Sequence, residues 1–208
     1  MGKRQMKLKH QNMKPLVKIL FAAIFFTGTA LTTQASGMEE FSGEEVSPLT
    51  FNKIQVSGNV SLSVDQRSKE NILVNGEYDR TKISLIKRGH TLIISNTASD
   101  QVEISVSVKD LQRIYASGNV SVSTCGKLNV QHLQVFLSDQ ARADIKADTE
   151  SLYTYITGNA SLKLSGTTKD HTLLKDSVSK INTDALAAVK VSAAAIKTEM
   201  IAVSLKGK

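Results

Sequence analysis

The chain has 208 residues, with 26 Lys and Arg against 19 Asp and Glu, and a formal net charge of +7. Six basic residues and no acidic ones lie within residues 1–35, so cleavage after Ala35 leaves 20 basic and 19 acidic residues. That balance lacks the basic footprint of a nucleic-acid-binding protein, and the single cysteine, Cys125, excludes an intramolecular disulfide and a cysteine-built zinc site.

The N-terminus has the pattern of a secretory signal peptide. Residues 1–18 are basic, an apolar run spans Ile19 to Leu31, and small residues follow at 33–36. The apolar run is shorter than the roughly 20 residues of a membrane-spanning helix. We therefore predict a signal peptide at 1–35, with an uncleaved signal anchor as the alternative. The mature protein is then exported to the periplasm, the cell surface or the medium, with no transmembrane segment after cleavage.

Residues 36–50 are acidic and aperiodic, and we expect a flexible lead-in there. From Phe51 to Val64 apolar and polar residues alternate, which is typical of a strand with one buried face. Further short strands are expected at 71–75, 81–87, 91–96 and 101–108, separated by tight turns. Residues 51–110 are therefore predicted to form a short-stranded, meander-like N-terminal part.

A short phrase recurs along the chain. Ser57-Gly58-Asn59-Val60-Ser61 returns at 117–121 and, as Thr-Gly-Asn-Ala-Ser, at 157–161, with weaker echoes at 138–142 and 175–179. From the second copy onward the echoes lie about 18 to 21 residues apart, a period typical of a β-solenoid. The predicted turn residues are Gly58, Asn59, Gly118, Asn119, Asp139, Gly158, Asn159 and Asp176.

These repeats predict an all-β protein in which residues 111–208 form the coils of a right-handed parallel β-helix, each coil with two or three very short strands. Residues 51–208 would make a single domain. Residues 184–203 fit two patterns, because apolar residues fall at helical spacing but also alternate. Continuity with the preceding coils favours strands, and the alternative is a helix that caps the last coil.

The order of these motifs resembles the head GIN domain, or putative auto-transporter adhesin, family. The resemblance rests on residues 51–60, on Leu92-Ile93-Ile94 before the alternating strand at 102–108, and most strongly on residues 111–120. It covers residues 50–205, with Asp139 and Asp176 standing where the family usually has glycine. The resemblance implies an exported β-helical protein of the kind common in Bacteroidetes, a domain of unknown function without established catalytic residues.

Aromatic residues are the main candidates for binding, and they are Tyr115, Phe136, Tyr153 and Tyr155. Tyr153 and Tyr155 are two positions apart and therefore share one face of a strand. If that face is outward, the pair forms a platform on which a sugar ring can stack. If it is inward, the two rings fill a widened coil.

The sequence shows no catalytic constellation, no metal-ligand spacing and no cofactor motif. A strip at Asp139, Arg142, Asp144 and Lys146 fits either a lyase-like site or, as we favour, a soluble face of mixed charge. The histidines His90, His132 and His171 are far apart, and we expect His171 in an exposed turn. Asp176-Ser177-Val178 matches a short O-glycosylation motif at Ser177, whereas the Asn-x-Ser phrases are interpreted as turn chemistry. Cys125 is expected at a coil corner, with an intermolecular disulfide as the alternative.

We therefore predict an exported, non-enzymatic β-solenoid that presents a repetitive surface to an envelope or extracellular glycan, or to a protein partner. Two alternatives stay open: a polysaccharide-processing enzyme on the same scaffold, and an envelope sensor or regulatory domain. The sequence gives no indication of the oligomeric state.

Overall fold

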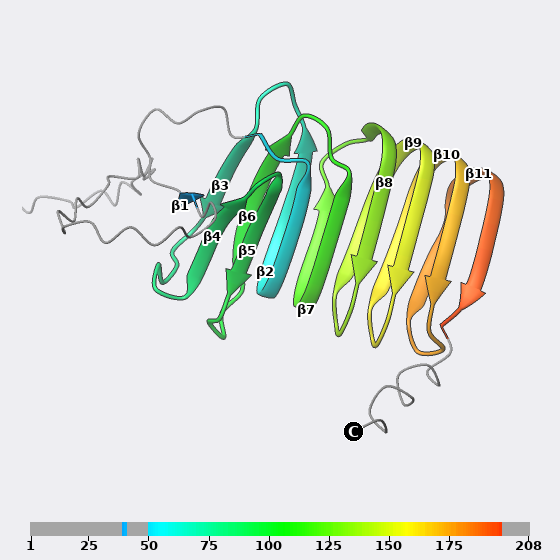
Figure 1. Ribbon diagram of the computed structural model, residues 1–208. Helices are drawn as coiled ribbons and strands as arrows, with labels where there is room; N and C mark the ends of the chain where they lie inside the picture. Colours follow the sequence, from blue (N-terminus) through cyan, green and yellow to red (C-terminus); the bar gives the residue numbers. More distant parts are fainter. Residues whose placement is uncertain (1–38, 41–49, 197–208) are drawn as a thin grey trace, which may run out of the picture.

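The computed structural model describes residues 39–40 and 50–196 (Figure 1). The predicted signal peptide, residues 1–35, lies outside the described residues. The strands are β1 (Glu39–Glu40), β2 (Lys53–Gln66), β3 (Asn71–Asn75), β4 (Ile83–Arg88), β5 (Thr91–Asn96), β6 (Val102–Val108), β7 (Arg113–Thr124), β8 (Leu128–Leu137), β9 (Arg142–Ile156), β10 (Ser161–Lys175) and β11 (Lys180–Ala195). No helix occurs within the described ranges, and the all-β prediction is confirmed.

The described strands form a single sheet with mostly parallel pairing, in the order β1-β4-β5-β2-β7-β8-β9-β10-β11. Strand β2 joins the two parts of the protein. Its first half pairs in parallel with β5, its second half pairs in parallel with β6, and β7 runs along both halves. In Figure 1 these strands lie side by side in a row from β4 to β11.

The N-terminal part differs from the meander that the sequence predicted. Strands β4 and β5 are a consecutive antiparallel pair, as in a meander, but β3 pairs with β6, and both β5 and β6 add in parallel to β2. Strand β1 pairs antiparallel with β4, so Glu39 and Glu40 have strand partners where a flexible lead-in was expected.

The long strands bend without breaking, whereas two or three very short strands per coil were predicted. Strands β2 and β7 turn back at the lower edge of Figure 1, and β9 and β10 bend at its upper edge. The pairing repeats regularly from strand to strand: Ser121 pairs with Arg142, Arg142 with Ser161, and Ser161 with Lys180. Each step therefore advances the chain by one repeat of the sequence and places similar positions next to each other.

The core follows from the alternation of side chains. In β6, Val102, Ile104, Val106 and Val108 are buried and the residues between them are at least partly exposed. Along the row of strands the inward positions are filled mainly by Val, Ile, Leu and Ala, and they form one continuous apolar cluster. The outward positions of the same strands are left to form the molecular surface.

Strand β11 ends the row at the C-terminal side. The prediction of strand over helix is confirmed for residues 184–195, whereas residues 197–203 lie outside the described residues. Val191 in β11 pairs with the buried His171 but is itself 57% exposed, because no described strand pairs with the outer edge of β11. Val189 is 87% exposed.

Candidate functional site

Three aromatic side chains lie next to one another on the outward face of adjacent strands. Tyr115 of β7 pairs with Phe136 of β8, and Phe136 pairs with Tyr155 of β9. Each sits between two buried residues of its own strand, which points the ring away from the core. We call these three residues the aromatic row. It continues to Leu174 of β10, which pairs with Tyr155 and is partly exposed.

Phe136 is the centre of this cluster. Its ring lies 5.6 Å from the ring of Tyr153 and 6.1 Å from the ring of Tyr155, tilted by 43° and 38°. Such tilted contacts are favourable for aromatic pairs. Phe136, Tyr153 and Tyr155 are half-buried, and Tyr115 is 39% exposed. The rings therefore support one another and present a fixed apolar surface between polar neighbours.

Arg113 holds the other side of Phe136. Its guanidinium lies 5.4 Å from the centre of the Phe136 ring, within the range of a cation–π contact. Its Nε donates a hydrogen bond to Oε1 of Gln134 at 2.8 Å. Arg113 is exposed, so the terminal nitrogens of its guanidinium are accessible beside the aromatic row. A flat apolar ligand surface, such as the face of a sugar ring, can stack on this row and bond at its rim.

The sequence placed Tyr153 and Tyr155 on one face of a strand, and the structure puts that face outward. What sequence reasoning missed is the lateral register that brings Tyr115 and Phe136 beside them, and the contact of Arg113. A signal was present: Tyr115, Phe136 and Tyr155 each stand two residues before the first residue of a turn phrase. Residues at the same place in successive repeats become neighbours across a parallel sheet.

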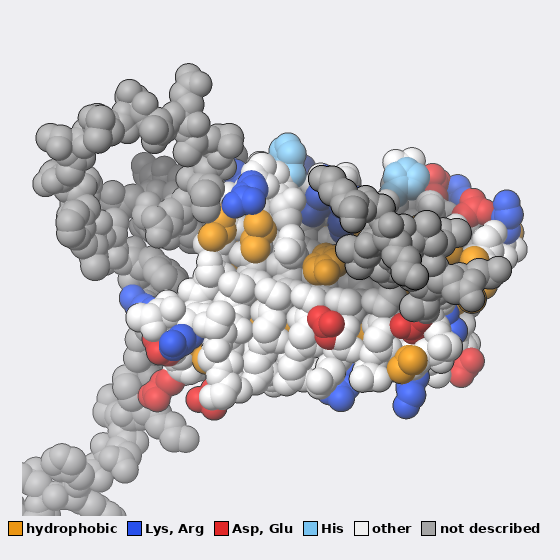
Figure 2. All heavy atoms as spheres, turned by 60° about the horizontal axis from the view of Figure 1, so that its bottom comes forward, with side chains coloured by type: hydrophobic (Ala, Val, Ile, Leu, Met, Phe, Trp, Pro, Cys, Tyr) orange, Lys and Arg blue, Asp and Glu red, His pale blue; other side chains and the backbone are white. Residues whose placement is uncertain are grey.

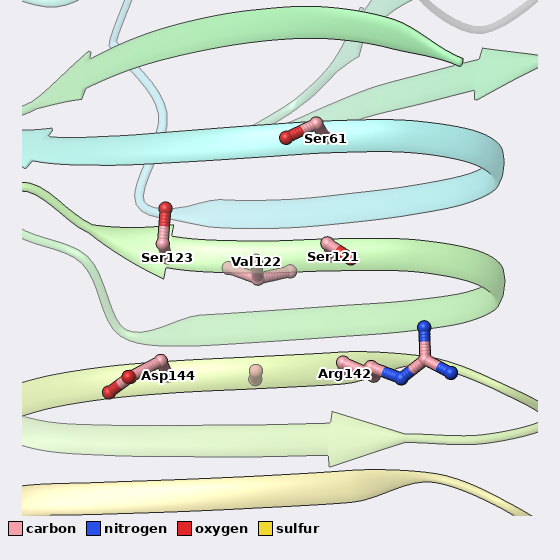
Figure 3. Close-up of a pocket in the computed structure, with 7 residues that line it drawn as sticks. Ser61, Ser121, Val122, Ser123, Arg142 and Asp144 are labelled. Atoms are coloured by element: carbon pink, nitrogen blue, oxygen red, sulfur yellow. The ribbon is translucent and has the colours of Figure 1, made fainter.

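Three residues of the predicted polar strip lie on the outward face of the first half of β9, and the fourth, Asp139, lies in the turn before it. Arg142, Asp144 and Lys146 alternate there with buried residues. Arg142 and Asp144 line a shallow pocket of about 280 Å³ together with Ser61, Ser121 and Ser123. Figure 3 shows the side chains of Arg142 and Asp144 pointing away from each other along β9. Asp144 forms an ion pair with Lys163 at 2.9 Å, and its carboxylate points away from the Arg142 guanidinium.

The turn phrases stack along one edge. The Ser57, Gly58 and Asn59 positions of β2 pair with Ser117, Gly118 and Asn119 of β7. The Asn119 side chain donates to Oδ1 of Asn59 at 2.9 Å, so stacked asparagines bond between neighbouring turns as turn chemistry predicts. Figure 2 looks toward the lower edge of Figure 1 and shows a band of uncharged side chains and backbone crossing the molecule there.

The two aspartates of the turn phrases occupy different positions. Asp139 has a φ of 61° and takes the place of glycine, as expected. Asp176 does not take the place of glycine. Its amide donates to the Ile156 carbonyl, just as the amide of Thr157, the first residue of its phrase, donates to the Leu137 carbonyl. Asp176 therefore occupies the first position of its turn phrase. Both carboxylates nevertheless accept a bond from a glycine amide of the preceding turn, Gly118 at 3.0 Å and Gly158 at 2.7 Å.

Asp176 is the better-held of the two aspartates. Its carboxylate also accepts from the amides of Ser179 at 2.8 Å and Val178 at 3.1 Å. Partial burial works to raise the pKa of Asp176, but the backbone amides outweigh it and the pKa lies below the ordinary value of 3.8. The same loop leaves Ser177 exposed.

His171 is buried, which corrects the prediction of an exposed turn. It lies in β10 with a side chain directed inward, 3% exposed, and its Nε2 is 3.0 Å from Oγ1 of Thr154. Burial lowers the pKa of His171 from its ordinary 6.5. Lys169 and Asp170, which precede it in β10, are exposed, and this explains the misleading local signal. His90 and His132 are exposed.

At the opposite edge, the carboxylates of Asp148 and Glu150 form ion pairs with Lys127 and Lys169. Hydrogen bonds from Lys127 and Thr167 lower the pKa of Asp148, and bonds from Lys169 and Gln131 lower that of Glu150. No group of His, Cys, Asp and Glu suited to a metal ion occurs in residues 39–40 and 50–196.

Cys125 is a free, exposed thiol at the turn between β7 and β8, 2.8 Å from the Ser63 hydroxyl. Within the described part of the chain, no helix is long and apolar enough to cross a membrane.

Comparison with known proteins gives one family and several related folds. The family model described as "Putative auto-transporter adhesin, head GIN domain" matches residues 50–198. No curated protein matches the chain. A crystal structure of a "putative adhesin" from Bacteroides fragilis NCTC 9343 is similar with a TM-score of 0.64 and 22% identity, over 70% of this chain and 72% of that one.

Two further structures come from Parabacteroides. A "putative lipid binding protein" from Parabacteroides distasonis ATCC 8503 has a TM-score of 0.58 and 12% identity, over 72% of this chain and 76% of the other. A "putative adhesin" from Parabacteroides merdae ATCC 43184 has a TM-score of 0.54 and 16% identity, over 70% and 73% of the two chains. At these identities the likeness concerns the fold alone.

Proposed function

This chain belongs to the head GIN domain family described as a putative auto-transporter adhesin, and from that premise we propose that it is an exported, non-enzymatic binding protein. Its ligand is an envelope or extracellular glycan, or a protein partner. The observation that supports binding is the aromatic row with Tyr153, a rigid apolar surface on the outside of a β-sheet. Exposed aromatic surfaces with polar borders are typical of binding sites.

We also propose that the chain winds as a right-handed parallel β-solenoid. Support comes from the parallel pairing of β7 to β11 and from repeats that are offset by one coil between neighbouring strands. Right-handed winding is expected because crossovers between parallel strands are almost always right-handed. Such a scaffold repeats similar side chains at about 4.8 Å, so weak contacts to a repetitive ligand add together.

Export is supported by the signal-peptide pattern of residues 1–35 and by the family. Binding rather than catalysis is supported by the chemistry of the polar pocket. There the Asp144 carboxylate is neutralised by Lys163 and the Arg142 guanidinium points away from it. General acid–base catalysis needs two such groups within reach of one substrate bond.

The test is glycan-array binding by the purified protein and by the double variant Tyr153→Ala/Tyr155→Ala. The control is Arg142→Ala/Lys180→Ala, which changes two outward residues on the other half of the repeat. We expect specific binding that the first variant loses and the control keeps. Equal binding by the tyrosine variant would place the site elsewhere. Turnover of an arrayed glycan, with or without calcium, would contradict the non-enzymatic proposal.

A further inference from the structure

A second row of outward residues runs beside the aromatic row, and one end of it is basic. Two residues before Tyr115 along β7 stands Arg113, which pairs with Lys53 of β2. Lys53 pairs with Thr91 of β5, and Thr91 pairs with Arg88 of β4. We call Arg88, Lys53 and Arg113 the basic row. Because neighbouring strands lie about 4.8 Å apart, Lys53 and Arg113 project side by side at that spacing.

No acid among residues 39–40 and 50–196 forms an ion pair with these three residues. Within the described residues, Lys53 and Arg88 have no ion-pair partner, and the contacts of Arg113 are the neutral Gln134 and the Phe136 ring. When both rows are extended through the paired residues of every strand from β4 to β11, no position in either row is Asp or Glu. Three lysines elsewhere on the surface are paired with acids: Lys127 with Asp148, Lys163 with Asp144, and Lys169 with Glu150.

Arg113 is held in a position that suits an anion. Its Nε is occupied by Gln134 and its planar group rests on Phe136, so the terminal nitrogens remain as an open fork. A guanidinium fork binds a carboxylate or sulfate with two parallel hydrogen bonds. The fork stands at the edge of the aromatic row, where an anionic group attached to a stacked ring would lie.

We propose that the ligand is a linear acidic polysaccharide that lies across the strands. Its sugar rings stack on Tyr115, Phe136 and Tyr155, and its carboxylate or sulfate groups bind Arg113 and Lys53. This inference rests on the proposed function and narrows its ligand to one chemical class. The direction of the chain follows from the surface, because both the apolar and the basic positions repeat from strand to strand and not along one strand.

A membrane surface fits these features less well. The aromatic row is bordered on its other side by the hydroxyl residues of the turn phrases, such as Ser117 and Ser138. The rings of Phe136 and Tyr155 are half-buried against each other, and they do not project as membrane anchors do. A strip of aromatic side chains with basic residues along one border matches a stiff polysaccharide chain.

The experiment is calorimetric titration of the purified protein with polygalacturonate, with neutral xylan and with vesicles of phosphatidylglycerol as comparison probes. The charge variant is Lys53→Gln/Arg113→Gln. The matched control is Arg142→Gln/Lys180→Gln, which removes the same charge from two outward residues on the other half of the repeat. Circular dichroism of each variant checks that it is folded.

We expect polygalacturonate to bind, to bind more weakly as salt is raised, and to lose at least about tenfold in affinity in the charge variant but not in the control. Equal affinity for xylan, unchanged in the charge variant, would overturn the acidic ligand while leaving a glycan-binding surface standing. Binding of vesicles and of neither polysaccharide would overturn this inference and the glycan proposal together.

Discussion

Replacing Gly58 by alanine tests whether the stacked turns hold neighbouring strands in close contact. Gly58 has a φ of +90°, and a Cβ atom there would lie 1.9 Å from the carbonyl oxygen of Asn96. Asn96 is the last residue of β5 and the direct partner of Gly58. The alanine can be accommodated only if β2 and β5 move apart at this point.

The cost has two parts. A positive φ costs a residue with a Cβ about 1–2 kcal/mol. Moving Asn96 also disturbs a side chain that is 2% exposed and donates to the carbonyls of Asn59 and Asp100, both at 2.8 Å. Leaving such a buried polar group unsatisfied costs about 1–3 kcal/mol. We expect Gly58→Ala to lower the free energy of unfolding by about 2–5 kcal/mol in all.

Gly126 is the matched control, because its φ of +97° is similar and no atom lies within 4 Å of the Cβ position. Gly126→Ala should therefore cost only the conformational part, about 1–2 kcal/mol. Urea unfolding followed by circular dichroism measures both. Equal losses in the two variants would refute the argument that the close approach of Gly58 to Asn96 matters.

Three further predictions concern the core and two titrating groups. Leu133→Ala, at a 0% exposed position, should lower the free energy of unfolding by about 2–5 kcal/mol, whereas Val189→Ala, at 87% exposed, should change it by less than about 0.5 kcal/mol in the same denaturation assay. The folded pKa of Asp176 lies below its unfolded value of 3.8, so its contribution to stability is present above that pH and is lost as the pH falls through the folded pKa. Asp176→Ala should therefore reduce the acid-induced loss of stability. The curve of unfolding free energy against pH should be flatter in this variant between about pH 5 and 2. Burial lowers the pKa of His171 below 6.5, so the unfolded chain binds the proton more readily and stability falls as the pH drops below about 6.5. The melting temperatures at about pH 7 and 5 should therefore differ less in His171→Gln than in the wild type. An equal difference would contradict the burial of His171.

Strand positions could be predicted wherever turn residues bracket an alternating run. The expected ranges 71–75 and 91–96 coincide with β3 and β5. The length of the later strands could not be predicted, because a strand that bends without breaking keeps the same alternation on both sides of the bend. The parallel addition of β5 and β6 to β2 was hidden for another reason: short spacing and tight turns also fit consecutive antiparallel pairing.

The site was predictable in its residue types and not in its arrangement. That Tyr153 and Tyr155 share one face follows from their spacing, whereas the sequence left open whether that face is outward or inward. Their neighbours depend on the offset between strands, which fixes that Phe136 lies between Tyr115 and Tyr155. The role of Arg113 depends on the same offset, since its contact with Phe136 joins residues of different strands.

The most direct test of the binding surface is the affinity of the Phe136→Ala variant for the glycan that the wild-type protein binds, measured by titration calorimetry. Phe136 supports the rings of Tyr153 and Tyr155 and the guanidinium of Arg113. Its truncation therefore removes the centre of the surface and loosens its rim. We predict an affinity at least about tenfold lower, with the fold intact by circular dichroism. An affinity equal to that of the wild type would contradict the assignment of this face as the binding surface.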